Sequence, residues 1–193
     1  MTTARERVLD ALISITAERG LDEVTIREVA ATAGVSIGTV QYYCRGKDEM
    51  LRLAFEHVSE RFLARVSAIP RKGSVRSVLR KALLEFLPLD DRRRTEARVY
   101  LAFAARAAVS PDLARVQQNL LGGLRRQCCD TFALAQERGQ TPPDLDPRRA
   151  GTAVAALIDG LLLHLLTDAT GISKRRALAA VDDMLDLYMT QPS

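Results

Sequence analysis

The sequence has few of the residues that build disulfides, metal sites and catalytic centres. Its 193 residues include three cysteines, two histidines (His57 and His164) and no tryptophan. The cysteine count is odd, and Cys128 and Cys129 are adjacent, so no disulfide framework is indicated. No spacing of His, Cys and carboxylates resembles a metal site, and no nucleophile with a base or phosphate-binding loop is recognisable. The sequence therefore predicts a protein that is not an enzyme and that needs no metal or cofactor.

Signals for export and for membrane insertion are also lacking. No positively charged segment followed by an apolar stretch, the pattern of a signal peptide, is present at the start. The longest apolar run, AVAALIDGLLLHLL at 153–166, is interrupted by Asp159 and is shorter than a membrane span. We expect a cytoplasmic protein with no membrane partner.

Charge is unevenly distributed along the chain. The formal net charge of +4 and the pI near 9.2 allow an anionic partner. Residues 1–50, however, contain six Lys/Arg against eight Asp/Glu, and the excess of cations lies further on, in RKGSVRSVLRK and DDRRRTEAR. The second run is typical of a solvated helix start, although it could bind an anion. Charge balance alone does not indicate that the partner is nucleic acid. An argument for nucleic-acid binding therefore depends on where individual cations lie.

Apolar residues recur at helical spacing in almost every segment. No stretch shows sustained alternation at period two, and there is no Asn-Gly hairpin signal. The pattern predicts an all-α protein of about nine helices, over 4–19, 25–33, 36–44, 47–66, 74–86, 91–109, 110–138, 147–167 and 173–189. We divide it into an N-terminal three-helix domain at 1–46 and a larger helical domain at 47–193, connected by the fourth helix.

The segment from residue 24 to residue 44 predicts a helix-turn-helix. In VTIREV, Thr25 is placed as an N-cap with Glu28 as its reciprocal partner in a capping box. Gly34 stands where a left-handed C-cap residue belongs, and Ser36 caps the next helix. Two short helices around one tight turn form a helix-turn-helix.

In such a unit the second helix enters the major groove of DNA, N-terminal residues first. A close approach to base edges requires small residues there, and the hydroxyl or methyl of Thr39 can contact a base. Hydroxyls, amides and cations that follow can reach phosphates. The predicted DNA-contacting set is Thr25, Arg27, Ser36, Ile37, Gly38, Thr39, Gln41, Tyr42, Tyr43 and Lys47.

Residues 7–55 resemble the N-terminal DNA-binding domain of the TetR family of transcriptional regulators. The matching stretch is GLDEVTIREVAATAGVSIGTVQYYCRGKDEML. The later helices fit that family's second domain in number and length, and LIDGLLLHLL at 157–166 is similar to the choline/betaine-regulator subgroup. The resemblance implies a repressor that binds an inverted-repeat operator in double-stranded DNA as a homodimer and responds to a small-molecule effector. A helical adaptor that binds only protein is the alternative, and the slightly acidic N-terminal segment favours it.

Two positions depart from the family pattern. Gln41 stands where the family has an aromatic residue that contacts a phosphate, and Cys44 stands where it has a core phenylalanine. Cys44 is either a smaller packing residue or a redox switch whose thiol pKa is lowered by Arg45 and Lys47. We favour the packing role, because free cysteine is among the most buried residue types.

The resemblance also implies an effector site and a dimer interface in the larger domain. Arg106 could pair with an anionic ligand there, or it could lie on the helix surface or pair with an acidic neighbour in the chain. Candidate effector contacts are Phe86, Tyr100, Phe103, Arg106 and Phe132. The last two helices would pack against their mates, helped by small residues at Gly151, Ala155 and Gly160. Candidate interface residues are Leu157, Leu161, His164, Leu165, Val181, Leu185 and Tyr188.

Overall fold

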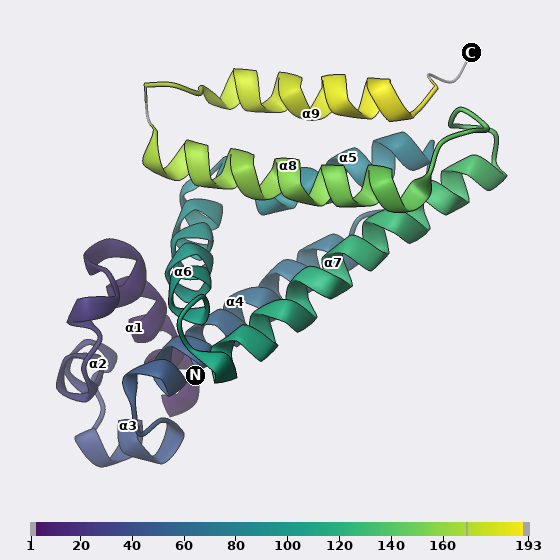
Figure 1. Cartoon of the computed structure of the whole chain (residues 1–193). Helices are drawn as coiled ribbons and strands as arrows, with labels where there is room; N and C mark the ends of the chain where they lie inside the picture. Colours follow the sequence, from purple (N-terminus) through teal and green to yellow (C-terminus); the bar gives the residue numbers. More distant parts are fainter. Residues whose placement is uncertain (1–2, 169, 191–193) are drawn as a thin grey trace. The chain divides into compact units, whose positions relative to one another are not determined.

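The computed structural model describes residues 3–168 and 170–190, and all regular structure within them is helical (Figure 1). Nine α-helices and one short 3₁₀ helix are present in this part of the chain, so the all-α prediction is confirmed. Two compact units are formed, one from residues 1–63 with 90–117 and the other from 64–89 with 118–193. This division by packing differs from the predicted division at residue 46, because a later helix packs with the N-terminal ones.

The first unit is built on α1 (Ala4–Arg19), which contacts the 3₁₀ helix and three other α-helices. These are α2 (Ile26–Ala33), α3 (Ile37–Tyr43) and α6 (Asp91–Ala107). The 3₁₀ helix (Leu21–Glu23), α4 (Lys47–Ser67) up to residue 63 and α7 (Pro111–Glu137) up to residue 117 complete the unit. Leu12, Val29 and Val40 are fully buried at its centre. The three N-terminal helices therefore share one core and hold α3 in a fixed position.

Local capping signals explain where these helices begin, with one correction. Thr25 caps α2 as predicted, since its hydroxyl accepts from the Glu28 backbone N at 3.2 Å. The reciprocal half of the predicted capping box is not formed, because the Glu28 carboxylate accepts from Arg19 Nη1 at 2.6 Å. A complete capping box is found instead at α1, between Thr3 and Glu6.

The second unit packs α5 (Val75–Phe86), α8 (Pro147–Thr167) and α9 (Lys174–Tyr188) against one another. Figure 1 shows α8 and α9 side by side. Arg80 of α5 holds Asp182 of α9 through two hydrogen bonds of 2.6 and 2.9 Å. The hydrogen bond from Arg80 lowers the pKa of Asp182, and Arg76 of α5 also pairs with Asp186 of α9. These ion pairs between α5 and α9 add to the apolar packing and hold α9 against α5.

Helix α8 is the most apolar helix of the chain. The helix extends beyond the apolar run at 153–166, and its 21 residues are long and apolar enough to cross a membrane by length and composition alone. Val154, Ile158, Leu162 and Leu165 are nonetheless buried within the chain itself. One side of α8 therefore packs in the core of the second unit.

Four of the predicted dimer-interface residues on α8 and α9 are buried within the chain itself. Leu161, Leu165, Val181 and Leu185 are at most 8% exposed within the single chain, so they offer almost no surface to a partner. They face the core because α5, α8 and α9 cover one another's apolar stripes. Of the other predicted residues, Leu157 and Tyr188 are half-buried, with Tyr188 edge-on to Phe132, and His164 is exposed.

Candidate nucleic-acid interface

The turn between α2 and α3 has the geometry of a helix-turn-helix. Gly34 adopts the left-handed conformation predicted for it, with φ 62° and ψ 41°, and its N–H donates to the carbonyls that end α2. Ser36 then caps α3, since its hydroxyl accepts from the Thr39 backbone N at 3.0 Å. Only a glycine adopts this backbone conformation at little cost. The tight turn holds the N-terminus of α3 at the surface.

One face of α3 packs on the core and the other is exposed. Val40 is fully buried, whereas Tyr42 is 84% exposed. Tyr43 is half-buried against the core and lies edge-on to Tyr42, with ring centroids 5.1 Å apart. Thr25, Arg27, Ser36, Ile37, Gly38 and Gln41 are also exposed, and Thr39 and Lys47 are partly exposed. An open depression on this surface is lined by Gly38, Gln41, Tyr42 and Arg45.

Gly38 has no packing reason to be glycine among the described residues. A Cβ built on it would meet only the Ser36 Oγ, at 3.7 Å, which is ordinary contact. Glycine inside a helix nevertheless destabilises it by roughly 0.5–1 kcal/mol relative to alanine. The missing side chain instead leaves room for a molecule outside the chain to approach the α3 backbone.

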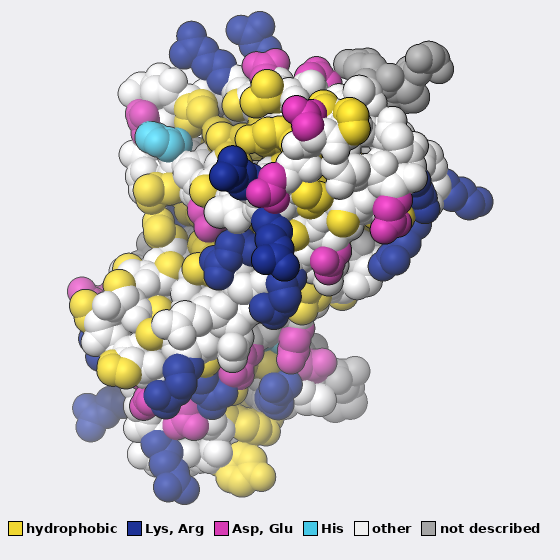
Figure 2. Space-filling view, turned by 45° about the vertical axis from the view of Figure 1, so that its right-hand side comes forward, with side chains coloured by type: hydrophobic (Ala, Val, Ile, Leu, Met, Phe, Trp, Pro, Cys, Tyr) yellow, Lys and Arg dark blue, Asp and Glu magenta, His cyan; other side chains and the backbone are white. Residues whose placement is uncertain are grey.

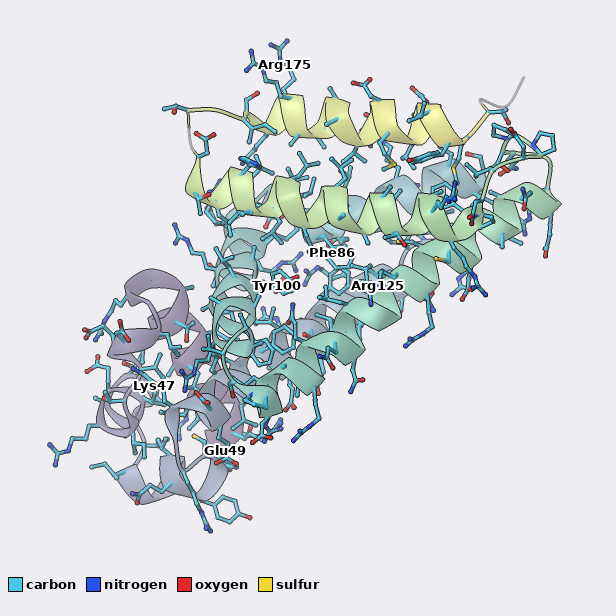
Figure 3. All side chains as sticks on the ribbon, viewed as in Figure 1. Lys47, Glu49, Phe86, Tyr100, Arg125 and Arg175 are labelled. Atoms are coloured by element: carbon cyan, nitrogen blue, oxygen red, sulfur yellow. The ribbon has the colours of Figure 1, made fainter. Side chains whose placement is uncertain are left out.

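The cations near α3 differ in whether an acidic residue contacts them. Lys47 Nζ lies 3.1 Å from the Asp22 carbonyl and 3.6 Å from its carboxylate (Figure 3). Arg27 is exposed, and Arg45 is exposed beside Gln41 and Tyr42. Neither Arg45 nor Asp22 is in the sequence-predicted set. Arg45 could have been found from the sequence, because it lies four residues after Gln41. Asp22 could not, because its contact with Lys47 joins residues 25 positions apart.

We expect Asp22→Asn to strengthen DNA binding. The exposed Asp22 carboxylate lies beside Lys47 and repels an approaching phosphate, whereas asparagine keeps the backbone carbonyl that holds Lys47. Fluorescence anisotropy at low salt should show binding stronger by about twofold to fivefold, a gain that shrinks as salt screens the charge. Lys47→Ala should do the opposite and lower the salt slope by roughly one. Equal affinity of Asp22→Asn and wild type would place Lys47 away from the DNA.

Cys44 is a packing residue of the small core. It is 1% exposed, and its thiol donates to the Val40 carbonyl at 3.5 Å. Burial, with a further contribution from the Glu49 carboxylate, raises the pKa of the thiol to about 11. The thiolate is the reactive form, so a raised pKa and a buried sulfur make Cys44 unreactive near neutral pH. The pKa shift is opposite to the one that a redox switch requires.

Cys44→Ser should therefore destabilise the protein without removing a redox response. A buried hydroxyl in this apolar surrounding lowers the free energy of unfolding by about 1–3 kcal/mol. Urea unfolding measures that loss, and peroxide should leave DNA binding of the wild type unchanged. If peroxide released the wild type from DNA, thiol reversed that release and Cys44→Ser abolished it, Cys44 would be a redox switch after all.

The candidate effector contacts fall in both units. Phe103 is fully buried and stacks on Phe55 at 3.8 Å, and Tyr100 also contacts Phe55, which sequence reasoning missed as a partner. Phe132 is fully buried in the second unit, where Phe86 is half-buried. Arg106 is exposed and pairs with Asp48, with Nε–Oδ1 at 2.8 Å. Its partner in the structure is therefore an acidic residue of the same chain. The other four residues stay a prediction as effector contacts.

Comparisons with known proteins agree with this geometry. The family of bacterial regulatory proteins called tetR matches residues 8–54, and the C-terminal region of BetI-type transcriptional repressors matches residues 75–189. A transcriptional regulator from Rhodococcus sp. Rha1 is 32% identical, with a TM-score of 0.86 over 99% of this chain and 100% of its own. The regulator BetI of Paraburkholderia phytofirmans is 28% identical over 96% of this chain and 93% of its own length. The regulator PksA of Bacillus subtilis is 28% identical over 89% of this chain and 83% of its own length.

The fold and the exposed α3 surface define a helix-turn-helix transcriptional regulator. The chain belongs to the TetR family, with a C-terminal region of the BetI type. It is a DNA-binding regulator, not an enzyme.

Proposed function

We propose that the protein is a cytoplasmic repressor that binds an inverted-repeat operator as a homodimer and is released by a small-molecule effector. The observation that carries this proposal is the exposed face of α3, where Gly38 leaves the backbone open and Gln41, Tyr42 and Arg45 surround it. Small residues at the helix start suit base edges, and the surrounding amide, hydroxyl and guanidinium suit phosphates.

The dimer is proposed to form through the exposed stripe of α8 and α9. On α8 this stripe lies opposite the buried residues, and it contains Leu163, which is 43% exposed. On α9 it contains Leu187, which is 71% exposed. Figure 2 shows apolar side chains at the surface over this region. Neighbouring apolar residues exposed in this way are typical of an interface. The stripe comprises Ala153, Ala156, Leu157, Gly160, Leu163 and His164 on α8, and Ala179, Asp183 and Leu187 on α9.

Leu163→Arg should convert the dimer to a folded monomer. A charge within the proposed interface must be desolvated without a partner, which disfavours association. The mutant should sediment as a monomer and lose operator affinity, because two linked recognition helices bind far more tightly than one. Leu134→Arg is the matched control, since Leu134 has similar exposure (40%) on α7 outside the stripe. Dimeric Leu163→Arg that binds the operator normally would place the interface elsewhere.

The effector is proposed to bind in the BetI-type part of the chain. A regulator from Saccharomonospora viridis was solved in complex with choline, and SmeT was solved in complex with triclosan, so proteins of this fold accommodate small molecules. Choline is the first compound to test, given the BetI-type match. A choline-dependent release of operator DNA would support it as effector, and unchanged binding at millimolar choline would exclude it.

Specific DNA binding is tested by competition. A labelled fragment from upstream of the gene should be bound in the presence of excess unrelated DNA, with an affinity that falls steeply as salt rises. A protein-binding adaptor would bind both fragments equally or not at all, and that outcome would reject the proposed function.

A further inference from the structure

Gln41 is an exposed residue of α3 whose side chain has no hydrogen-bond partner among the described residues. Other polar groups at the start of this helix are engaged with one another. Ser36 Oγ lies 2.8 Å from Thr39 Oγ1 and accepts from the Thr39 backbone N at 3.0 Å. Ile37 is 46% exposed and has no polar atom in its side chain. Gln41 therefore presents an unoccupied amide on this face, with both a donor and an acceptor.

The Gln41 side chain lies next to the open space at Gly38. The two residues are three positions apart, so they are neighbours on one face of α3, and both line the open depression. Long side chains of a helix point back towards its N-terminus, so the Gln41 amide can extend over the turn that contains Gly38. Glycine puts no side chain in its way. The amide can therefore reach the N-terminal end of α3, which is the end that enters a major groove first.

Phosphates have stronger partners than Gln41 around the same depression. Tyr42 is 84% exposed, and the exposed Arg45 follows the C-cap of α3 with a positive charge. A guanidinium binds phosphate more strongly than a neutral amide does, because its hydrogen bonds are charge-assisted. A carboxamide has what a guanidinium lacks, an acceptor beside its donors. That combination matches the N6 donor and the N7 acceptor of adenine in the major groove.

We propose that the Gln41 carboxamide recognises an adenine in each operator half-site, with its oxygen accepting from N6 and its nitrogen donating to N7. The inference rests on the proposed function, which requires only a phosphate contact from Gln41. It assigns one base pair of the operator to one side chain. Both half-sites contain an A·T pair at the same place, because the two subunits of a homodimer present the same surface.

The test varies base pairs and the Gln41 side chain together. Selection from random DNA with the wild type gives the preferred half-site, and each position is then changed in one half-site only. Fluorescence anisotropy should show one A·T pair whose replacement weakens binding by about fivefold to 100-fold. Gln41→Ala should lose the preference at this position and keep the others. Gln41→Glu should prefer cytosine in place of that adenine, because a carboxylate accepts from cytosine N4.

Substitution of 7-deazaadenine at that position separates a base contact from an effect of DNA shape. This base has a C–H group in place of N7, so the wild type should bind it more weakly by about twofold to tenfold. Gln41→Ala should bind adenine and 7-deazaadenine equally. Gln127→Ala is the matched control, since it removes an exposed glutamine from α7, and it should keep every preference of the wild type.

The failure of this inference differs from the failure of the proposed function. Binding without any sequence preference by the wild type would reject the proposed function itself. If the wild type has a preferred sequence, two results for Gln41→Ala overturn adenine recognition alone. One is that it retains every preference, and the other is that it weakens binding to all fragments equally, as loss of a phosphate contact does. Thermal unfolding checks that each variant is folded, and Gln41→Glu repeats the test with a second side chain.

Discussion

Gly38→Glu is expected to weaken operator binding by about 100-fold or more while leaving the fold intact. The fold tolerates the change because a Cβ at Gly38 meets only the Ser36 Oγ, at 3.7 Å, and the position is exposed. Replacing a helical glycine even favours the helix by several tenths of a kcal/mol. The DNA complex does not tolerate it, because a long side chain occupies the space between α3 and the base edges and its charge is repelled by phosphates.

The control for Gly38→Glu separates this effect from charge alone. Ala105→Glu adds the same side chain to an exposed position of α6 in the same unit. It should change affinity by no more than a few-fold, through long-range repulsion that salt screens. Anisotropy gives both affinities, and circular dichroism gives both unfolding temperatures. A Gly38→Glu protein that binds as well as Ala105→Glu would mean that α3 does not lie against the DNA.

Gly151→Ala should lower the stability of the protein. Helices α7 and α8 approach so closely here that a Cβ on Gly151 would lie 2.7 Å from the Cys129 backbone N and Sγ and 3.0 Å from its Cα. A side-chain end could rotate away, but the backbone of a helix cannot move without disturbing its neighbours. Overpacking of this kind lowers the free energy of unfolding by about 1–3 kcal/mol, and Gly151→Val should exceed that range.

Gly123→Ala is the control for this close contact. Gly123 lies in the same unit on α7, and nothing is found within 4 Å of a Cβ placed there. Its replacement should raise stability by about 0.5–1 kcal/mol through helix propensity. Urea unfolding at one fixed protein concentration measures both variants. Equal stability of Gly151→Ala and wild type would show that the two helices separate readily at this point.

The sequence was informative where the structure depends on neighbouring residues. Thr25, Ser36 and Gly34 were placed correctly because caps and left-handed turns act within one helical turn. The exposed face of α3 followed from the same local signals together with the family resemblance. The half-formed capping box at Glu28 could not be predicted, because its competing partner, Arg19, comes from another helix.

The sequence was misleading where an apolar stripe could have more than one partner. Leu161 and Leu165 recur at helical spacing, which shows that something covers them but not whether it is the same chain or a second copy. Gly151 was assigned to a close dimer contact for the same reason, and the structure uses it against Cys129. Arg106 illustrates the limit for charges, since its partner Asp48 lies 58 residues away along the chain.

Footprinting on the DNA upstream of the gene tests most directly whether α3 is the recognition helix of an operator-binding dimer. The wild type should protect two half-sites related as an inverted repeat, with centres one helical turn apart, roughly 34–36 Å, or a multiple of it. Gly38→Glu at the same concentration should leave both half-sites unprotected. Protection without symmetry, or an unchanged footprint with Gly38→Glu, would contradict the account.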